Sequence, residues 1–141
     1  MATISKTKVC LRVIGDDLIP NEISKLLGNE PTRMMIKGEP FSWSKQGKPR
    51  IAKSGMWRIE ASEKIPGNLD EQISELLSQL TGNLDIWRSL SEKYTIDMFC
   101  GLFMEASMEG ISLSAKSLLS LGQRGIEIDF DMYGPDEDEN V

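Results

Sequence analysis

The architecture of this chain follows from a segment that reads Lys8-Val-Cys-Leu-Arg-Val-Ile14, and from the residues after it. Within the segment, Val9, Leu11 and Val13 are each separated by a single residue. Successive side chains of a strand point to opposite faces, so this spacing places all three apolar side chains on one face. The segment therefore predicts a strand with one buried face.

A helix and a second strand follow. The helix is predicted over Pro20–Leu27, because the fixed φ of proline suits a first turn and Gly28 suits a left-handed stop. The second strand is predicted over Arg33–Lys37. The same succession of strand, helix and strand recurs near the C-terminus, over Thr95–Met104, Ser112–Leu121 and Gly125–Tyr133.

One strand and two helices lie between the two copies. Gly55–Glu60 has strand character, Asn68 is a good N-cap for a helix over Leu69–Leu80, and a shorter helix is predicted over Leu84–Lys93. The first six principal elements have the ferredoxin-like order β-α-β-β-α-β, and an extra α-β follows. We therefore predict an α+β fold, with a mixed, mainly antiparallel sheet and helices on one face.

The last predicted strand alternates cleanly between apolar and acidic residues. Its apolar side chains are expected to face the core and its acidic ones to face outward: Ile126, Ile128, Phe130 and Met132 inward; Glu127, Asp129 and Asp131 outward.

Length and composition predict one domain and a short tail. A chain of 141 residues with 40% apolar content suits a single α+β domain over residues 1–135, followed by an acidic, disordered tail over 136–141. No apolar run approaches the roughly 18 residues that cross a bilayer. We expect a cytoplasmic protein with no membrane partner, in which Cys10 and Cys100 are buried, reduced thiols.

Charge is distributed unevenly along the chain. The formal net charge is −6, yet seven basic residues and one acid, Glu39, lie between Arg33 and Arg58. This segment therefore carries +6 and the rest of the chain −12. The overall acidity argues weakly against general binding to nucleic acids.

Several segments in a shared order resemble an uncharacterised, mainly bacterial family, DUF4279. The resemblance runs from about Val9 to Tyr133. It rests on Leu18–Ile23 with Leu27-Gly28, Pro31-Thr32, Lys37-Gly-Glu39, Ser54-Gly-Met-Trp57, Leu69–Leu80 and Ile126–Tyr133. It implies a compact α+β domain of a bacterial cytosol, and it brings no activity and no catalytic residues.

Missing residue types exclude the familiar catalytic signatures. The chain has no histidine, which removes Ser-His-Asp and Cys-His nucleophile arrangements and histidine-containing zinc sites. It has only two isolated cysteines and no glycine-rich phosphate loop. We expect a protein that is not an enzyme and that uses no cofactor.

The basic segment is the strongest candidate binding site. Aromatic and basic side chains alternate there, a combination that suits single-stranded nucleic acid, a small anion or an acidic protein surface. The candidate residues are Phe41, Trp43, Lys45, Lys48, Arg50 and Lys53. The other interpretation is a solvated hairpin, with Trp57 and Phe41 packed at the edge of the core.

Carboxylates offer a second possibility. Asp16, Asp17, Asp129 and Asp131 would serve a metal enzyme if they converged in one pocket. The other interpretation is a solvated outer face, in which the acids of the last strand pair with Lys6, Lys8 and Arg12 of the first strand.

These observations favour a non-catalytic protein-interaction or binding module, with another protein as partner. The alternatives are an anion or nucleic-acid binder that uses loop 38–54, a toxin-immunity-type protein, and a carboxylate-based metal enzyme. The oligomeric state does not follow from the sequence.

Overall fold

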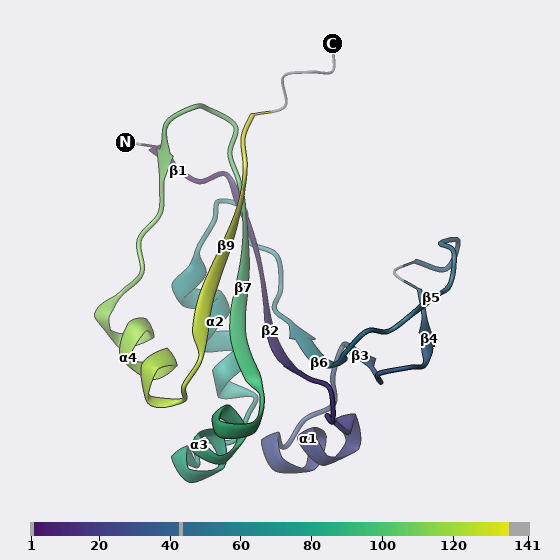
Figure 1. Cartoon of the computed structure of the whole chain (residues 1–141). Coiled ribbons are helices and arrows are strands. Elements are labelled where there is room, and N and C mark those ends of the chain that lie inside the picture. The colour runs from purple at the N-terminus through teal and green to yellow at the C-terminus, as the bar shows by residue number, and fades with distance from the viewer. Residues whose placement is uncertain (1, 43, 136–141) are drawn as a thin grey trace.

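The computed structural model describes residues 2–42 and 44–135. At its centre is a five-stranded sheet with the strand order β3-β6-β2-β7-β9 (Figure 1). The strands are β2 (Lys6–Gly15), β3 (Arg33–Met35), β6 (Gly55–Glu60), β7 (Thr95–Phe103) and β9 (Glu127–Tyr133).

The connections confirm the predicted ferredoxin-like arrangement. The pairs β3/β6, β6/β2 and β2/β7 are all antiparallel. The additional strand β9 pairs in parallel with β7, so it needs a crossover connection, which helix α4 provides. The fold is thus α+β with a mainly antiparallel sheet.

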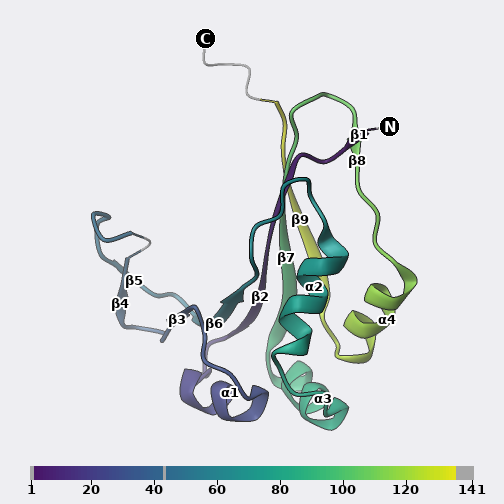
Figure 2. The same cartoon turned by 180° about the vertical axis from the view of Figure 1, so that it is seen from behind.

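The described residues form four helices, which lie on one face of the sheet and at one end of it (Figure 2). They are α1 (Pro20–Leu27), α2 (Leu69–Ser78), α3 (Leu84–Lys93) and α4 (Ala115–Gln123). Two predicted helix ends are confirmed: Gly28 has a φ of 84°, and the Asn68 side chain accepts a hydrogen bond from the Glu71 N–H at 3.1 Å. None of the described helices is long and apolar enough to cross a membrane.

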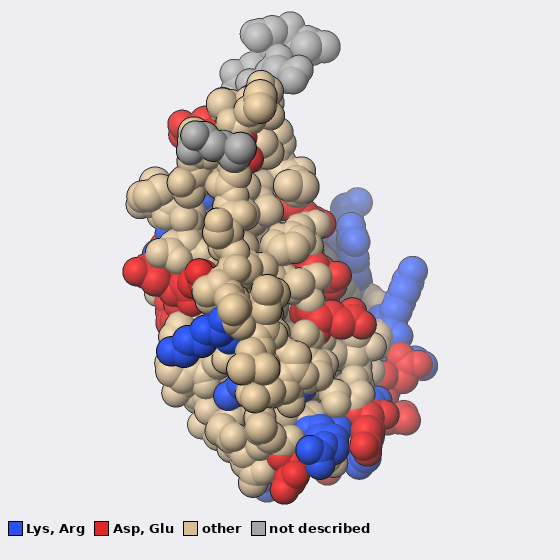
Figure 3. All heavy atoms as spheres, turned by 90° about the vertical axis from the view of Figure 1, so that its left-hand side faces the viewer, with Lys and Arg blue, Asp and Glu red and all other residues tan. Residues whose placement is uncertain are grey.

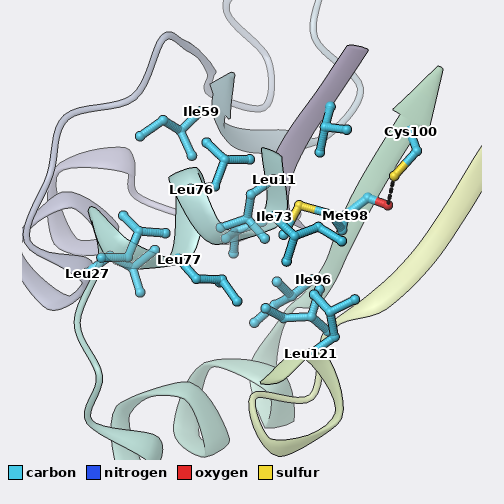
Figure 4. Packing of buried hydrophobic residues seen from close by; sticks show 14 of the residues in the cluster. Leu11, Leu27, Ile59, Ile73, Leu76, Leu77, Ile96, Met98, Cys100 and Leu121 are labelled. Atoms are coloured by element: carbon cyan, nitrogen blue, oxygen red, sulfur yellow. Dashed lines mark hydrogen bonds between the residues drawn. The ribbon is translucent and has the colours of Figure 1, made fainter. Parts of the chain in front are cut away.

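The core lies between the helices and the inner face of the sheet (Figure 4). Leu11 of β2 and Met98 of β7 are fully buried there against Ile73 and Leu76 of α2. Burial of such a side chain contributes about 1.5–3 kcal/mol.

A buried amide attaches α2 to the sheet. The Gln72 Nε2 donates to the Thr7 carbonyl at 2.8 Å, and the Thr7 hydroxyl donates to the Gln72 Oε1 at 2.6 Å. The same hydroxyl accepts from the Asn68 N–H at 3.0 Å. These three hydrogen bonds join β2 to α2 or its cap, and a fourth runs from the Gln72 Nε2 to the Ser62 carbonyl at 3.0 Å, so this polar contact sets the position of the helix along the strand.

Two small sheets complete the described structure. β1 (Ala2–Thr3) pairs in parallel with β8 (Glu109–Gly110). β4 (Pro40–Phe41) and β5 (Arg50–Ile51) form a hairpin that projects from the body of the molecule (Figure 1). The predicted loop over 38–54 is an exposed hairpin in its described residues, whereas the predicted acidic tail, 136–141, lies outside the described residues.

Two side chains of β9 lie on the predicted face of the sheet but are not buried. Phe130 and Met132 lie on the helix side, but 44% and 66% of their surfaces are exposed. The prediction that they belong to the core was wrong because β9 is an edge strand and the helices cover only its first part, near Ile126 and Ile128.

Candidate functional site

The face of the sheet that points away from the helices is uncovered, and Figure 1 looks onto it. We call it the open face. The strand registers bring basic residues of β3, β6 and β2 together at one side of this face and acidic residues of β7 and β9 at the other side. In the row through Arg12, the order is Arg33, Arg58, Arg12, Asp97 and Glu127.

Three arginines therefore lie side by side on neighbouring strands. Arg58 is directly opposite Arg12 on one side and Arg33 on the other. Like charges in directly opposed positions destabilise a sheet. A row of this kind is favourable when anionic groups lie over it.

Arg12 has such an anionic partner within the chain. Its Nε and Nη2 donate to the two carboxylate oxygens of Asp97 at 2.8 and 2.5 Å. Burial alone would raise the pKa of Asp97, but the hydrogen bonds with Arg12 and Asp129 lower it below its usual range. The hydrogen bond with Asp97 raises the pKa of Asp129, the next acid on the open face.

The guanidinium of Arg58 has fewer hydrogen-bond partners than that of Arg12. Its Nε is buried and makes no hydrogen bond within the described part of the chain, and the Glu60 carboxylate lies 3.6 Å away. A buried donor without an acceptor costs about 1–3 kcal/mol. Arg58 therefore keeps hydrogen-bonding capacity that the described part of the chain does not use.

An apolar groove of about 610 Å³ lies beside this row of arginines. Ile14, Met35 and Met56 contribute from the sheet, and Phe41 and Ile51 from the hairpin. Arg50 and Lys53 stand at its edge. The groove thus combines an apolar lining with cations.

Hydrogen bonds close the base of the hairpin, and an ion pair connects this base to the body of the molecule. The Ala52 N–H donates to the Glu39 carbonyl and the Gly38 N–H to the Ala52 carbonyl, both at 2.9 Å. Gly38 has a φ of 87°, which other residues rarely adopt. The Lys37 Nζ and the Asp16 carboxylate, 3.1 Å apart, connect the base of the hairpin to the loop after β2.

The structure brings only some of the predicted site residues together. Phe41, Arg50 and Lys53 line the groove, with Phe41 half-buried. Lys45 and Lys48 are exposed near the tip of the hairpin. Trp43 lies outside the described residues. Trp57 is buried in the core, where its Nε1 donates to the Ser24 Oγ at 3.0 Å.

A second hollow of about 330 Å³ lies on the other side of Arg58. Its lining includes Cys10, Phe99 and Phe103. The aromatic rings are already in contact with other groups: the Arg12 guanidinium lies 4.4 Å from the Phe99 ring, and Tyr133 stacks on Phe103 at 4.7 Å. These contacts compete with base stacking, the main contribution of aromatic groups to binding single-stranded nucleic acid.

The two cysteines are free thiols on opposite faces of the sheet. Cys10 pairs with Phe99 on the open face, and Cys100 pairs with Val9 on the core face. Burial raises the pKa of Cys10 to about 11 and that of Cys100 to about 12. Both sulfurs therefore remain protonated at neutral pH, which makes them poor nucleophiles.

The four acids of the metal-enzyme hypothesis do not converge. Asp16 follows the end of β2 and pairs with Lys37, whereas Asp129 lies on β9, in the same cross-sheet row as Cys10. Residues 2–42 and 44–135 contain no group of three acidic or cysteine side chains that could hold a metal ion.

The predicted pairing of acids with the first strand was also wrong in its geometry. Strand β7 lies between β2 and β9, so Arg12 pairs with Asp97 of β7, and Lys8 lies 3.5 Å from Glu63.

Sequence reasoning missed part of the site. Arg12, Arg58, Ile14, Met35 and Met56 belong to strands that were predicted, but their shared location depends on the strand order. A signal in the sequence could have located some of them. The members of each pair, Arg33/Met35 and Met56/Arg58, are two residues apart, which places both on one face of a strand.

Comparison with known proteins gives a family and no activity. No curated protein and no solved structure matches the chain significantly. The family model described as a domain of unknown function (DUF4279) matches residues 5–135. The chain belongs to the DUF4279 family.

Proposed function

We propose that this protein is an interaction module that binds an acidic, partly apolar segment of another protein. The observation that carries this proposal is the apolar groove between the hairpin and the open face, with Arg50 and Lys53 at its edge and Arg58 nearby. The apolar lining suits aliphatic or aromatic side chains, and the cations suit the carboxylates between them.

Charge supports this choice of partner. The segment from Arg33 to Arg58 carries +6 within an acidic chain, so it attracts anionic groups more strongly than the rest of the surface does. Complementary charges speed association and select the partner, while burial of apolar surface supplies affinity. An acidic peptide with apolar side chains uses both properties of the groove.

Nucleic acid is the less favoured ligand. The described aromatic rings of the open face already contact cations or one another, and Phe41 is half-buried at the groove. Backbone phosphates could contact the lysines, but the apolar lining formed by Met35 and Met56 would then have no matching group.

The test uses methionine methyl groups as reporters. Met35 and Met56 line the groove, whereas Met98 lies in the core. Protein labelled with ¹³C at the methionine methyls is titrated with a synthetic heptapeptide of alternating aspartate and leucine, and with oligo-dT as a competitor ligand. We expect the Met35 and Met56 signals to shift with the peptide, and the Met98 signal to stay in place.

Charge reversal provides the matched control. Arg50→Glu/Lys53→Glu should weaken peptide binding by roughly tenfold or more, because two attractive charges become repulsive. Lys25→Glu/Lys116→Glu makes the same charge change at exposed positions on α1 and α4 and should leave affinity unchanged. Unshifted Met35 and Met56 signals, or stronger binding of oligo-dT than of the peptide, would refute the proposal.

A further inference from the structure

A second binding surface lies at the opposite edge of the sheet. We propose that β9 accepts an added strand from a partner protein, and that this strand alternates basic with apolar residues. The inference does not depend on the groove, because β9 and the hairpin lie at opposite sides of the molecule (Figure 1).

The backbone of β9 has one unpaired side. The Met104 N–H donates to the Tyr133 carbonyl at 2.9 Å, so the backbone groups of Tyr133 point toward β7. Successive residues of a strand direct their backbone groups to alternate sides, so those of Ile128, Phe130 and Met132 point outward. Among the described residues, no strand pairs with this outer side.

The edge of β9 is protected by acidic side chains alone. Proteins protect exposed edges with proline, charged side chains (lysine above all), bulges or very short strands. β9 has seven residues, contains neither proline nor lysine, and pairs with β7 in an unbroken register from Glu127 to Tyr133. An edge of this kind is suited to strand addition.

Apolar side chains accompany the free edge. Phe130 and Met132 are 44% and 66% exposed on the helix side of β9, and Leu118 and Leu119 of the flanking α4 are 51% and 61% exposed. Figure 3 looks onto this side of the molecule and shows a band without charged atoms between acidic groups. The apolar residues of an added strand would cover Phe130 and Met132.

The acidic side chains of β9 indicate which kind of strand can be added to its edge. The open-face side chains of β9 include Glu127, Asp129 and Asp131, all exposed, so an added strand needs basic residues at the facing positions. Antiparallel pairing with β9 of a second copy would place these acids beside one another. The edge is therefore matched to a basic strand of a different protein.

The experiment uses a blocked synthetic decapeptide of alternating lysine and valine, with its glutamate–valine counterpart as the control ligand. Strand addition should slow amide hydrogen exchange at Phe130 and Met132 by roughly tenfold or more, because their N–H groups gain partners. The Asp129 amide, which points toward β7, should change little. The glutamate peptide should not bind.

Two variants make the test specific. Phe130→Pro removes an outward N–H while leaving the bonds to β7, so it should abolish binding without loss of the fold. Glu127→Lys/Asp131→Lys changes only exposed side chains and should transfer binding from the lysine peptide to the glutamate peptide. Glu22→Lys/Glu92→Lys, with the same charge change at exposed positions on α1 and α3, should leave the preference for the lysine peptide unchanged.

Three results would overturn the inference. The first is unchanged lysine-peptide affinity after the Glu127→Lys/Asp131→Lys change. The second is protection that appears elsewhere than on β9. The third is self-association of the unliganded chain in light scattering that Phe130→Pro reverses, which would show that a second copy occupies the edge.

Discussion

At the scale of single residues, the ion pair between Arg12 and Asp97 is the most enclosed charge pair among the described residues of the sheet. Asp97 is only 3% exposed, and both of its carboxylate oxygens accept hydrogen bonds from the guanidinium. Breaking a buried pair from one side is costly because the remaining charge loses its partner.

Arg12→Ala should therefore lower the free energy of unfolding by roughly 3 kcal/mol at neutral pH, toward the lower part of the range because Arg12 is partly exposed. The folded state lowers the pKa of Asp97, so its stabilising contribution is present above the pKa of the unfolded chain and is lost in acid. The difference in the free energy of unfolding between the wild type and Arg12→Ala should therefore decrease as pH falls. Urea unfolding at several pH values measures this difference.

Lys8→Ala is the control for this prediction. Lys8 and Glu63 form an exposed ion pair at 3.5 Å, so its loss should cost less than about 1 kcal/mol. Equal effects of the Arg12 and Lys8 changes would contradict the importance assigned to the Asp97 pair.

Asp129 should show the opposite dependence on pH. The hydrogen bond with Asp97 raises its pKa, so the folded state favours the protonated carboxyl, and this contribution is lost as pH rises through the folded-state pKa. Asp129→Asn imitates the protonated form. We expect it to raise stability at neutral pH by less than about 1 kcal/mol, since the carboxylate is exposed and screened.

The gain from Asp129→Asn should disappear below about pH 4, where the wild-type carboxyl is itself protonated in both states. Melting temperatures across this range, with Asp131→Asn of the same strand for comparison, provide the measurement. A gain that persists unchanged in acid would contradict the raised pKa of Asp129 as its cause.

At the scale of elements, we expect that the β4–β5 hairpin can be shortened with little effect on the stability of the fold. Residues 44–49 are all exposed, and Phe41 lies opposite Arg50 in the ladder. Replacing residues 42–49 with Asn-Gly would therefore connect Phe41 to Arg50 by a two-residue turn. We expect the free energy of unfolding to change by no more than about 0.5 kcal/mol.

The same shortening should reduce affinity for the aspartate–leucine peptide, because it removes Lys45 and Lys48 while Arg50 and Lys53 remain. Calorimetric titration and thermal melting on one sample separate the two effects. A shortened chain that keeps full affinity would show that the tip plays no part in binding.

At the scale of the whole molecule, one continuous core joins the ferredoxin-like part to the additional α4–β9 unit. Leu11 of β2 and Leu121 of α4 belong to the same buried cluster, and β7 pairs with both β2 and β9. Unfolding should therefore be a single cooperative transition.

Leu11→Ala and Leu121→Ala should each destabilise the chain by about 2–5 kcal/mol and should move the whole transition together. Calorimetry with fluorescence and circular dichroism as parallel probes tests this. A separate, earlier transition confined to Leu121→Ala would show that α4 and β9 unfold as an independent unit.

Local patterns made the elements predictable. Period-two alternation in β2, proline and glycine at the ends of α1, and the Asn68 cap of α2 all depend on neighbours within a few residues, so they can be recognised without tertiary structure. The exposed hairpin was predictable for the same reason, because glycine, proline and charge gather between residues 38 and 54.

The sequence by itself determined the order and type of the elements, the exclusion of histidine chemistry and the position of the basic segment. Only the tertiary structure decided that β7 separates β2 from β9, that Arg33, Arg58 and Arg12 lie side by side, and that Phe130 and Met132 are exposed at an edge. The physical reason is that strand order and edge position arise from contacts between residues far apart in the chain, and alternation within one strand carries no information about its neighbours.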